Sequence, residues 1–163
     1  MKDVRPTSSR VLLALFSMLG QMEGRSFLDL FAGTGRVGLE AASRGASSVV
    51  FVESVKSRAS AIENEAKREA NDVTVLSLEL RRAVSWLLKR DMKFDVIFAD
   101  PPYNDGWGAE LLSVKGIDGL LSPGGVFVAE HSAREELALA PSWTLERRRD
   151  YGETVLSFLT YSV

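Results

Sequence analysis

The stretch Asp29-Leu-Phe-Ala-Gly-Thr-Gly-Arg-Val-Gly38 decides how the rest of the chain is interpreted. It closes an apolar run at Phe27–Phe31 and opens a helical pattern at Val37–Ser43. Glycines at such a junction let the backbone turn sharply and approach a ligand, and the first turn of the helix offers unpaired N–H groups. The three glycines also fit the dinucleotide spacing G-x-G-x-x-G. The motif alone therefore leaves a nicotinamide enzyme, another nucleoside-type cofactor and a plain tight turn open.

Short apolar runs alternate with helical patterns outward from this loop. Strands that are apolar on both faces and separated by helices indicate a parallel sheet covered on each side. Before the loop, Thr7 or Ser8 is expected to cap a helix that Gly20 ends. After the loop, the expected strands and helices are Val49–Val52, Val55–Ala70, Val73–Leu78, Arg81–Lys89, Phe94–Ala99 and Gly125–Ala129.

The end of the chain departs from this alternation. Trp143–Arg149 and Thr154–Tyr161 are two strand-like runs with no room for a helix between them, which predicts a hairpin. We therefore expect an α/β, doubly wound, Rossmann-like domain over residues 1–163, with a mostly parallel seven-stranded sheet and a C-terminal antiparallel hairpin.

Composition limits the function classes. The chain has 163 residues, a formal charge of −2 and no cysteine, so no disulfide and no thiolate metal site is possible. The longest apolar run, Val11–Phe16, is too short to cross a bilayer, and no secretion signal precedes it, so we expect a cytoplasmic protein. Any binding of nucleic acid must come from local basic patches, for which Arg5, Arg10 and Arg147–Arg149 are the candidates. A solvated face is the alternative interpretation of Arg147–Arg149.

Two carboxylates favour one cofactor class. Asp29, just before the glycines, would repel a pyrophosphate but suits a cofactor with positive groups. S-adenosylmethionine carries an ammonium group and a sulfonium and no phosphate. Glu53 ends the second strand, where it can hold ribose hydroxyls. Glu79 and Leu80 follow the third strand, where such enzymes hold adenine; a solvated glutamate at a helix start is the alternative.

A second segment, Asp100-Pro-Pro-Tyr103, follows the expected strand Phe94–Ala99 directly. Its prolines fix an extended loop and leave carbonyls free to accept hydrogen bonds. An aromatic ring that stacks on a base contributes roughly 1–3 kcal/mol. If Asp100 and the Pro101 carbonyl accept both N–H bonds of a planar amine, its lone pair is free to attack a methyl carbon, and no metal is needed. A polar turn after a buried strand is the alternative.

Nearly the whole chain resembles the bacterial 16S ribosomal RNA guanine-N2 methyltransferases of the small-subunit methyltransferase D type. The segment Asp100–Tyr103 is shared with adenine-N6 methyltransferases, so it does not by itself determine which base is methylated. The resemblance rests on Arg5–Arg10 with Leu15 and Phe16, Leu28–Gly35 with Gly38, Leu39 and Glu40, Ser43–Ala46, Glu53, Asp100–Tyr103, Ser122–Gly125, Glu130 with His131, and Tyr151–Thr154.

The resemblance implies a class I S-adenosylmethionine-dependent methyltransferase that modifies N2 of a guanine in 16S rRNA, guanine 966. Because few basic groups are visible and the base must leave its stack, we expect a partly assembled small subunit to be preferred over naked RNA. The resemblance also implies a monomer, with residues 1–24 near the RNA. Catalysis is carried over to Asp100, Pro101, Pro102 and Tyr103. Cofactor binding is carried over to Asp29, Phe31, Ala32, Gly33, Thr34, Gly35 and Glu53. From their positions in the sequence, we also expect cofactor contacts at Glu79 and Leu80 and substrate contacts at Arg5, Thr7, Arg10 and Trp107.

Three other interpretations stay open. A DNA or RNA adenine-N6 methyltransferase would use the same two segments. Asp29 and Asp100–Tyr103 count against a nicotinamide oxidoreductase, and the intactness of both segments counts against a catalytically silent assembly factor. His131 is expected to be structural rather than catalytic, and Trp86 and Trp143 are expected in the core.

Overall fold

The computed structural model describes residues 7–69, 72–103 and 105–162. Contacts within the chain divide it into two compact units, Met1–Leu80 and Arg81–Val163, each described by itself below. The expectation that residues 1–163 act as one methyltransferase domain stays a prediction.

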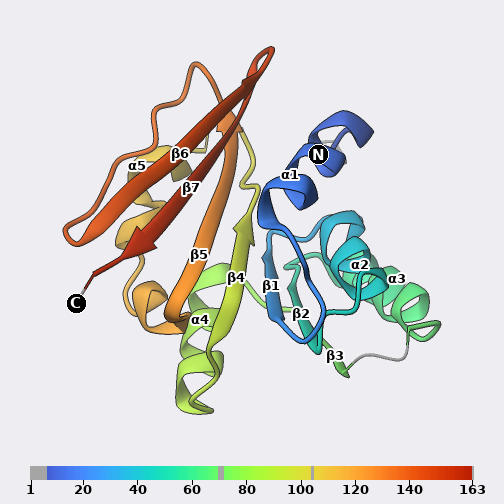
Figure 1. Cartoon of the computed structure of the whole chain (residues 1–163). Coiled ribbons are helices and arrows are strands. Elements are labelled where there is room, and N and C mark those ends of the chain that lie inside the picture. Colours follow the sequence, from blue (N-terminus) through green and yellow to red (C-terminus); the bar gives the residue numbers. More distant parts are fainter. Residues whose placement is uncertain (1–6, 70–71, 104, 163) are drawn as a thin grey trace. The chain divides into compact units, whose positions relative to one another are not determined.

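The first unit is built on three parallel strands in the order β3-β2-β1. Helices α2 and α3 pack against these strands (Figure 1). The last four residues of β1 and of β2 are all buried, as the sequence predicts for strands covered on both faces. The elements are α1 (Ser9–Leu19), β1 (Ser26–Leu30), α2 (Arg36–Ser43), β2 (Ser48–Val52), α3 (Lys56–Ala66) and β3 (Asp72–Leu76).

Helix α1 begins and ends where its sequence predicts. The Ser8 hydroxyl accepts a hydrogen bond from the Val11 amide at 3.2 Å, which satisfies one unpaired donor of the first turn. Gly20 ends the helix with a φ of 73°, a left-handed conformation that glycine adopts without strain. The buried face consists of Val11, Leu12, Leu15 and Phe16.

The second unit has strands in the order β4-β5-β7-β6, of which β4 and β5 are parallel. Strand β7 runs antiparallel to both β5 and β6, and β6 with β7 forms the expected hairpin (Figure 1). The elements are α4 (Leu80–Lys89), β4 (Phe94–Ala99), α5 (Trp107–Glu110), the 3-10 turns η1 (Leu111–Ser113) and η2 (Ile117–Leu120), β5 (Leu121–Ser132), β6 (Trp143–Tyr151) and β7 (Thr154–Tyr161).

The predicted fold class is confirmed. The described residues contain seven strands, mostly parallel, with helices between them and an antiparallel pair at the end of the chain. No helix in this part of the chain has both the length and the apolar character that a membrane crossing requires.

Some expected boundaries differ from the structure. Strand β5 spans Leu121–Ser132, well beyond the expected Gly125–Ala129, because Leu121 already pairs with Phe94 of β4 before the register shifts. Helix α3 ends at Ala66, so its last turn is shorter than predicted. Trp143 is buried as expected, but Trp86 is only partly buried, and the Arg90 guanidinium lies 3.6 Å from its ring centre.

Candidate active site

The segments that follow β1, β2 and β3 lie at one edge of the first unit. These strands are parallel and in register, so their carboxyl ends point the same way. The loop Asp29–Gly35, Glu53 and Glu79 all belong to this edge. Ligands of open α/β sheets bind at the carboxyl ends of the strands, so this edge is the candidate cofactor site.

The glycine loop has left-handed backbone at three of five successive positions. The φ values are 57° at Phe31, 59° at Gly33 and 80° at Gly35. A left-handed conformation costs a residue with a side chain about 1–2 kcal/mol, so Phe31 is strained. A Cβ at Gly35 would lie 2.9 Å from Ile62 Cγ1, and one at Gly38 would collide with the Phe51 ring. Glycine is therefore required by packing as well as by φ.

Asp29 holds the helix that follows the loop. Its side chain is 1% exposed, and Oδ2 accepts a hydrogen bond from the Gly38 amide at 2.9 Å. Gly38 is the third residue of α2, where an anion is stabilised by the helix dipole and by amides that have no partner within the helix. This contact fixes the direction in which α2 leaves the loop.

Glu53 closes the loop from the neighbouring strand. Its Oε1 accepts from the Gly33 amide and its Oε2 from the Val55 amide, both at 2.8 Å. The Arg58 guanidinium lies 4.0 Å from the same Oε2. The sequence predicts a ribose ligand at Glu53 but gives no sign of this clamp. A carboxylate oxygen has two acceptor positions, so the clamp and a ribose hydroxyl are compatible.

The charges at this edge separate the cofactor classes. Two buried carboxylates, Asp29 and Glu53, lie at the base of the loop. The Gly33 amide, a donor that a phosphate would use, already donates to Glu53. A pyrophosphate would meet like charges in poorly solvated surroundings, whereas an ammonium group, a sulfonium and hydroxyl donors suit these acceptors. The residues present therefore fit S-adenosylmethionine and do not fit a dinucleotide.

The remaining predicted cofactor residues lie in the glycine loop and at the start of α4. Ala32 donates its amide to the Val52 carbonyl at 2.9 Å, which ties the loop to β2. Thr34 is exposed at the tip of the loop. Glu79 is exposed just before α4, while Leu80 is buried as the first residue of that helix. Leu80 thus packs in the core, and Glu79 is the residue of this pair with a polar group accessible to a ligand.

The amine segment Asp100–Tyr103 follows β4 in the second unit, as predicted. Pro101 is buried and Pro102 is exposed, while Asp100 and Tyr103 are partly exposed. A buried proline holds the start of the loop rigid, and the partial exposure of its neighbours leaves a carboxylate and an aromatic ring within reach of a substrate. A few residues later the chain enters the short helix α5.

Trp107 begins α5 beside a charged pair. The Arg81 guanidinium lies 4.9 Å from the Trp107 ring centre and also donates to Glu110 Oε2 at 3.0 Å. Trp107 is partly exposed, so its ring is available for stacking in the second unit. The cation that covers this ring is not predicted from the sequence, because Arg81 and Trp107 are far apart along the chain.

The predicted RNA contacts are found in different surroundings. Arg5 lies outside the described residues. Thr7 is buried, and its carbonyl accepts from Arg36 Nη1 at 2.7 Å, while Arg36 Nη2 donates to Ser9 Oγ at 2.7 Å. Arg10 is exposed on the first turn of α1. Arg36 therefore ties the start of α1 to the helix that follows the glycine loop.

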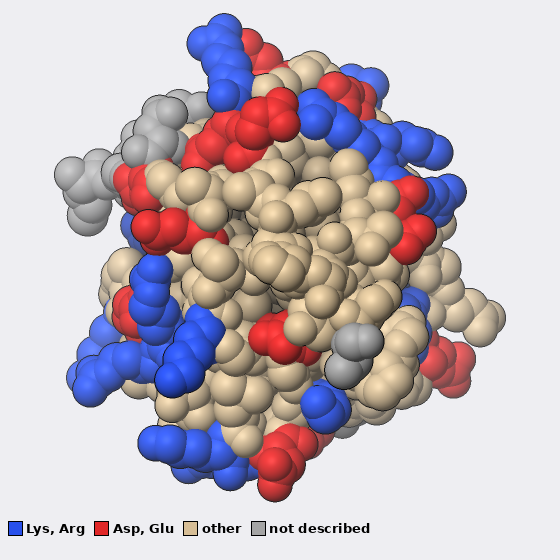
Figure 2. Space-filling view, turned by 90° about the vertical axis from the view of Figure 1, so that its left-hand side faces the viewer, with Lys and Arg blue, Asp and Glu red and all other residues tan. Residues whose placement is uncertain are grey.

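The arginine run of β6 is exposed but divided between the two faces of the strand. Side chains alternate along a strand, so Arg147 and Arg149 share one face and Arg148 lies on the other. Arg148 Nε donates to Asp150 Oδ1 at 3.0 Å, and this hydrogen bond raises the pKa of Arg148 above its ordinary value. On the face drawn in Figure 2, basic and acidic side chains are interspersed and neither sign covers the surface.

Comparison with known proteins gives matches along nearly the whole chain. Residues 1–160 match the family described as conserved hypothetical protein 95. A Bacillus subtilis protein named putative rRNA methyltransferase YlbH is 34% identical, over 93% of this chain and 85% of that protein. Ribosomal RNA small subunit methyltransferase D of Escherichia coli strain K12 is 29% identical, over 92% and 76%. The solved structure of the putative methyltransferase yhhF from Escherichia coli gives a TM-score of 0.82 at 26% identity, covering 99% of this chain and 91% of that one.

Proposed function

The chain belongs to the conserved hypothetical protein 95 family, and on that premise we propose that it methylates N2 of a guanine in 16S rRNA with S-adenosylmethionine as donor. Its fold is that of the class I methyltransferases. Relatives named as rRNA methyltransferases support RNA as the substrate. The observation that carries the proposal is the segment Asp100–Tyr103, directly after β4 in a chain of this family. By resemblance, the target is guanine 966.

The first unit supplies the cofactor site. S-adenosylmethionine, when bound, supplies a methyl group activated by the sulfonium. Asp29 and Glu53 provide the negative charge and the hydroxyl acceptors that this cofactor requires, and the backbone of Phe31–Gly35 shapes the loop around it. Glu79 and Leu80 border the same edge, on the side of β3.

The second unit supplies the amine site. The Asp100 carboxylate and the Pro101 carbonyl accept the two N–H bonds of the exocyclic amine, which frees its delocalised lone pair for attack on the methyl carbon. The same two acceptors stabilise the positive charge that develops on nitrogen, and fixed acceptors of this kind lower barriers by several kcal/mol. Tyr103 stacks on the base, and Pro102 keeps the loop extended.

The substrate is the RNA of a partly assembled small subunit in the cytoplasm, which the protein approaches as a monomer. The net charge of −2 leaves Arg5, Arg10 and the β6 arginines as the basic groups for phosphate contact, and Trp107 is a further candidate contact to the substrate. Few phosphate contacts give weak binding, and the salt dependence of that binding scales with the number of contacts. A particle that already presents the base unstacked spares the protein an unstacking cost of a few kcal/mol.

A second candidate is methylation of adenine N6 in DNA or RNA. Asp100–Tyr103 supports it, because the same acceptors and aromatic ring suit that amine equally well.

The proposal is tested by offering the purified protein methyl-labelled S-adenosylmethionine with three substrates in parallel: small-subunit particles, protein-free 16S rRNA and duplex DNA. We expect label in the RNA of the particles, slower labelling of free rRNA that falls further at higher salt, and none in DNA. Label in DNA would favour the adenine alternative. Equal rates on particles and on free rRNA, with little salt dependence, would contradict the assembly context.

A further inference from the structure

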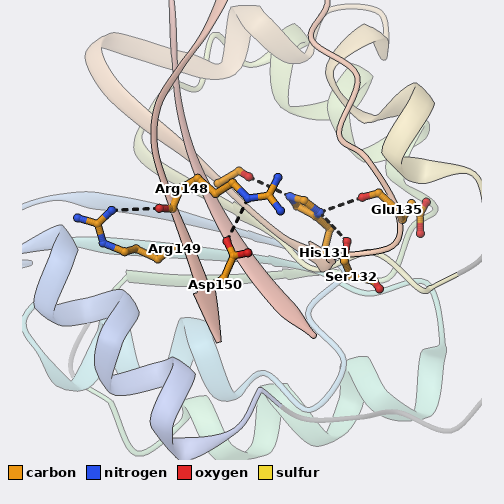
Figure 3. Close-up of polar contacts among 7 residues, drawn as sticks. His131, Ser132, Glu135, Arg148, Arg149 and Asp150 are labelled. Carbon is orange, nitrogen blue, oxygen red and sulfur yellow. Dashed lines mark hydrogen bonds and ion pairs between the residues drawn. The ribbon is translucent and has the colours of Figure 1, made fainter. Parts of the chain in front are cut away.

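His131 is the only histidine of the chain and lies buried near the end of β5. Its Nδ1 is 3.0 Å from two carbonyl oxygens, those of Ser132 and Glu135 (Figure 3). Its Nε2 is 2.9 Å from the hydroxyl of Ser157 on β7. A carbonyl only accepts, so Nδ1 carries the proton and donates to both oxygens. Both ring nitrogens are thus engaged within the fold, which leaves His131 without a direct part in methyl transfer.

The contact with Glu135 joins His131 to the segment that follows β5. We call residues 133–140 the strap; it connects β5 to β6 and has no helix or strand of its own. At its start the Ala133 amide donates to the Glu153 carbonyl at 2.8 Å. His131 then fixes the strap two residues further along, at the Glu135 carbonyl.

The strap is also hydrogen-bonded to helix α5. The Gly108 amide donates to Glu135 Oε1 at 2.9 Å, and the Gly108 carbonyl accepts from the Ala138 amide at 2.7 Å. A Cβ at Gly108 would lie 2.5 Å from the Glu136 carbonyl oxygen, so the two backbones approach as closely as glycine alone permits. Gly108 is buried and is the second residue of α5, a few residues after Tyr103.

We propose that His131 and Glu135 are positioning residues for the amine-binding loop Asp100–Tyr103. Strand β4 fixes the beginning of this loop, and α5, held by the strap, fixes its end. Ser157, His131, Glu135 and Gly108 form one continuous hydrogen-bonded chain from β7 to α5. The expected effect on the methylation rate rests on the proposed function. The expected effect on the order of the loop does not.

Isosteric substitutions separate the roles of the two ring nitrogens. In His131→Asn the side-chain amide takes the place of Nδ1 and still donates to the carbonyls, whereas in His131→Gln it takes the place of Nε2 and the hydrogen bonds from Nδ1 to the Ser132 and Glu135 carbonyls are lost. Glu135→Gln keeps an oxygen for the Gly108 amide, and Glu135→Ala does not. Glu136→Ala, which removes the exposed carboxylate next along the strap, is the matched control. Gly108→Ala displaces the strap without deleting any hydrogen-bonding group.

Two readouts are measured on each variant: hydrogen exchange of the backbone amides of Asp100, Tyr103 and residues 105–110, and the single-turnover methylation rate at saturating cofactor and particles. We expect His131→Gln, Glu135→Ala and Gly108→Ala to exchange faster in this loop and to lose about 10²-fold in rate, the usual effect of a misplaced reacting group. The dissociation constant for S-adenosylhomocysteine should not change. The variants His131→Asn, Glu135→Gln and Glu136→Ala should stay near wild type in both readouts.

Several outcomes would overturn the inference. Unchanged loop exchange in Glu135→Ala and Gly108→Ala would show that the strap does not hold the loop. Faster exchange with an undiminished rate would show that the loop needs no positioning. Equal losses in His131→Asn and His131→Gln would indicate general damage to the fold. If the wild-type protein methylates no substrate, the proposed function fails, while the exchange data still decide whether the strap holds the loop.

Discussion

Asp100 is the residue on which the proposed chemistry depends most directly. It follows β4 in the second unit, and the carboxylates that suit the cofactor, Asp29 and Glu53, belong to the first. We therefore expect Asp100→Ala to reduce the single-turnover rate by at least about 10²-fold, the scale of one lost charge-stabilising group, with the affinity for S-adenosylhomocysteine nearly unchanged. Rapid-quench methylation and calorimetry measure the two quantities separately.

Asp105 provides the control for this prediction. It is an exposed carboxylate in the same connection between β4 and α5, so Asp105→Ala removes the same charge from a position that the mechanism does not use. A rate close to wild type in Asp100→Ala, or an equal loss in Asp105→Ala, would show that Asp100 is not the orienting acceptor.

Strand β6 carries the arginine run that we propose as an RNA contact. Arg147 and Arg149 share one face, and Arg148 is paired with Asp150. Each phosphate contact contributes about 0.7 to 0.9 to the slope of log affinity against log salt. We expect the double variant Arg147→Ala, Arg149→Ala to reduce the magnitude of this slope by about 1 to 2 in filter-binding titrations on small-subunit particles.

Arg148→Ala is the matched control on the same strand. Because its guanidinium already has a carboxylate partner and lies on the other face, its loss should change the slope by much less than 1. Equal changes in the salt slope for Arg147→Ala, Arg148→Ala and Arg149→Ala, each made singly, would indicate that the run acts through its net charge. An unchanged slope in all three variants would show that β6 does not contact the RNA.

The bounds of a strand were predicted correctly where the hydrophobic pattern of the sequence was unambiguous. The bounds of β4 and β7 match the expected Phe94–Ala99 and Thr154–Tyr161, because mostly apolar runs with turn residues on either side define them. The left-handed Phe31 and the clamp of Glu53 on Gly33 were not predicted. The clamp arises because neighbouring strands bring together residues 20 positions apart, and no periodicity in the sequence records such a contact.

At the scale of the whole molecule, the chain's order of elements was the most predictable feature and the context of its only histidine the least. Alternating apolar runs and helices are sufficient to indicate an α/β fold. The tie from His131 through Glu135 to Gly108 joins three segments that have no shared motif, so it became visible only in the folded chain. The reacting groups of the candidate site were proposed from the sequence, whereas the contacts that hold them could be found only in the folded chain.

The identity of the modified base tests the central claim for the molecule as a whole. Small-subunit particles that lack the modification are incubated with the protein and S-adenosylmethionine, and their 16S rRNA is digested to nucleosides for mass analysis. We expect one new methylated nucleoside, N2-methylguanosine, that maps to the fragment containing guanine 966 and is missing with Asp100→Ala. The appearance of N6-methyladenosine in its place, or of no new methylated nucleoside, would contradict the proposal.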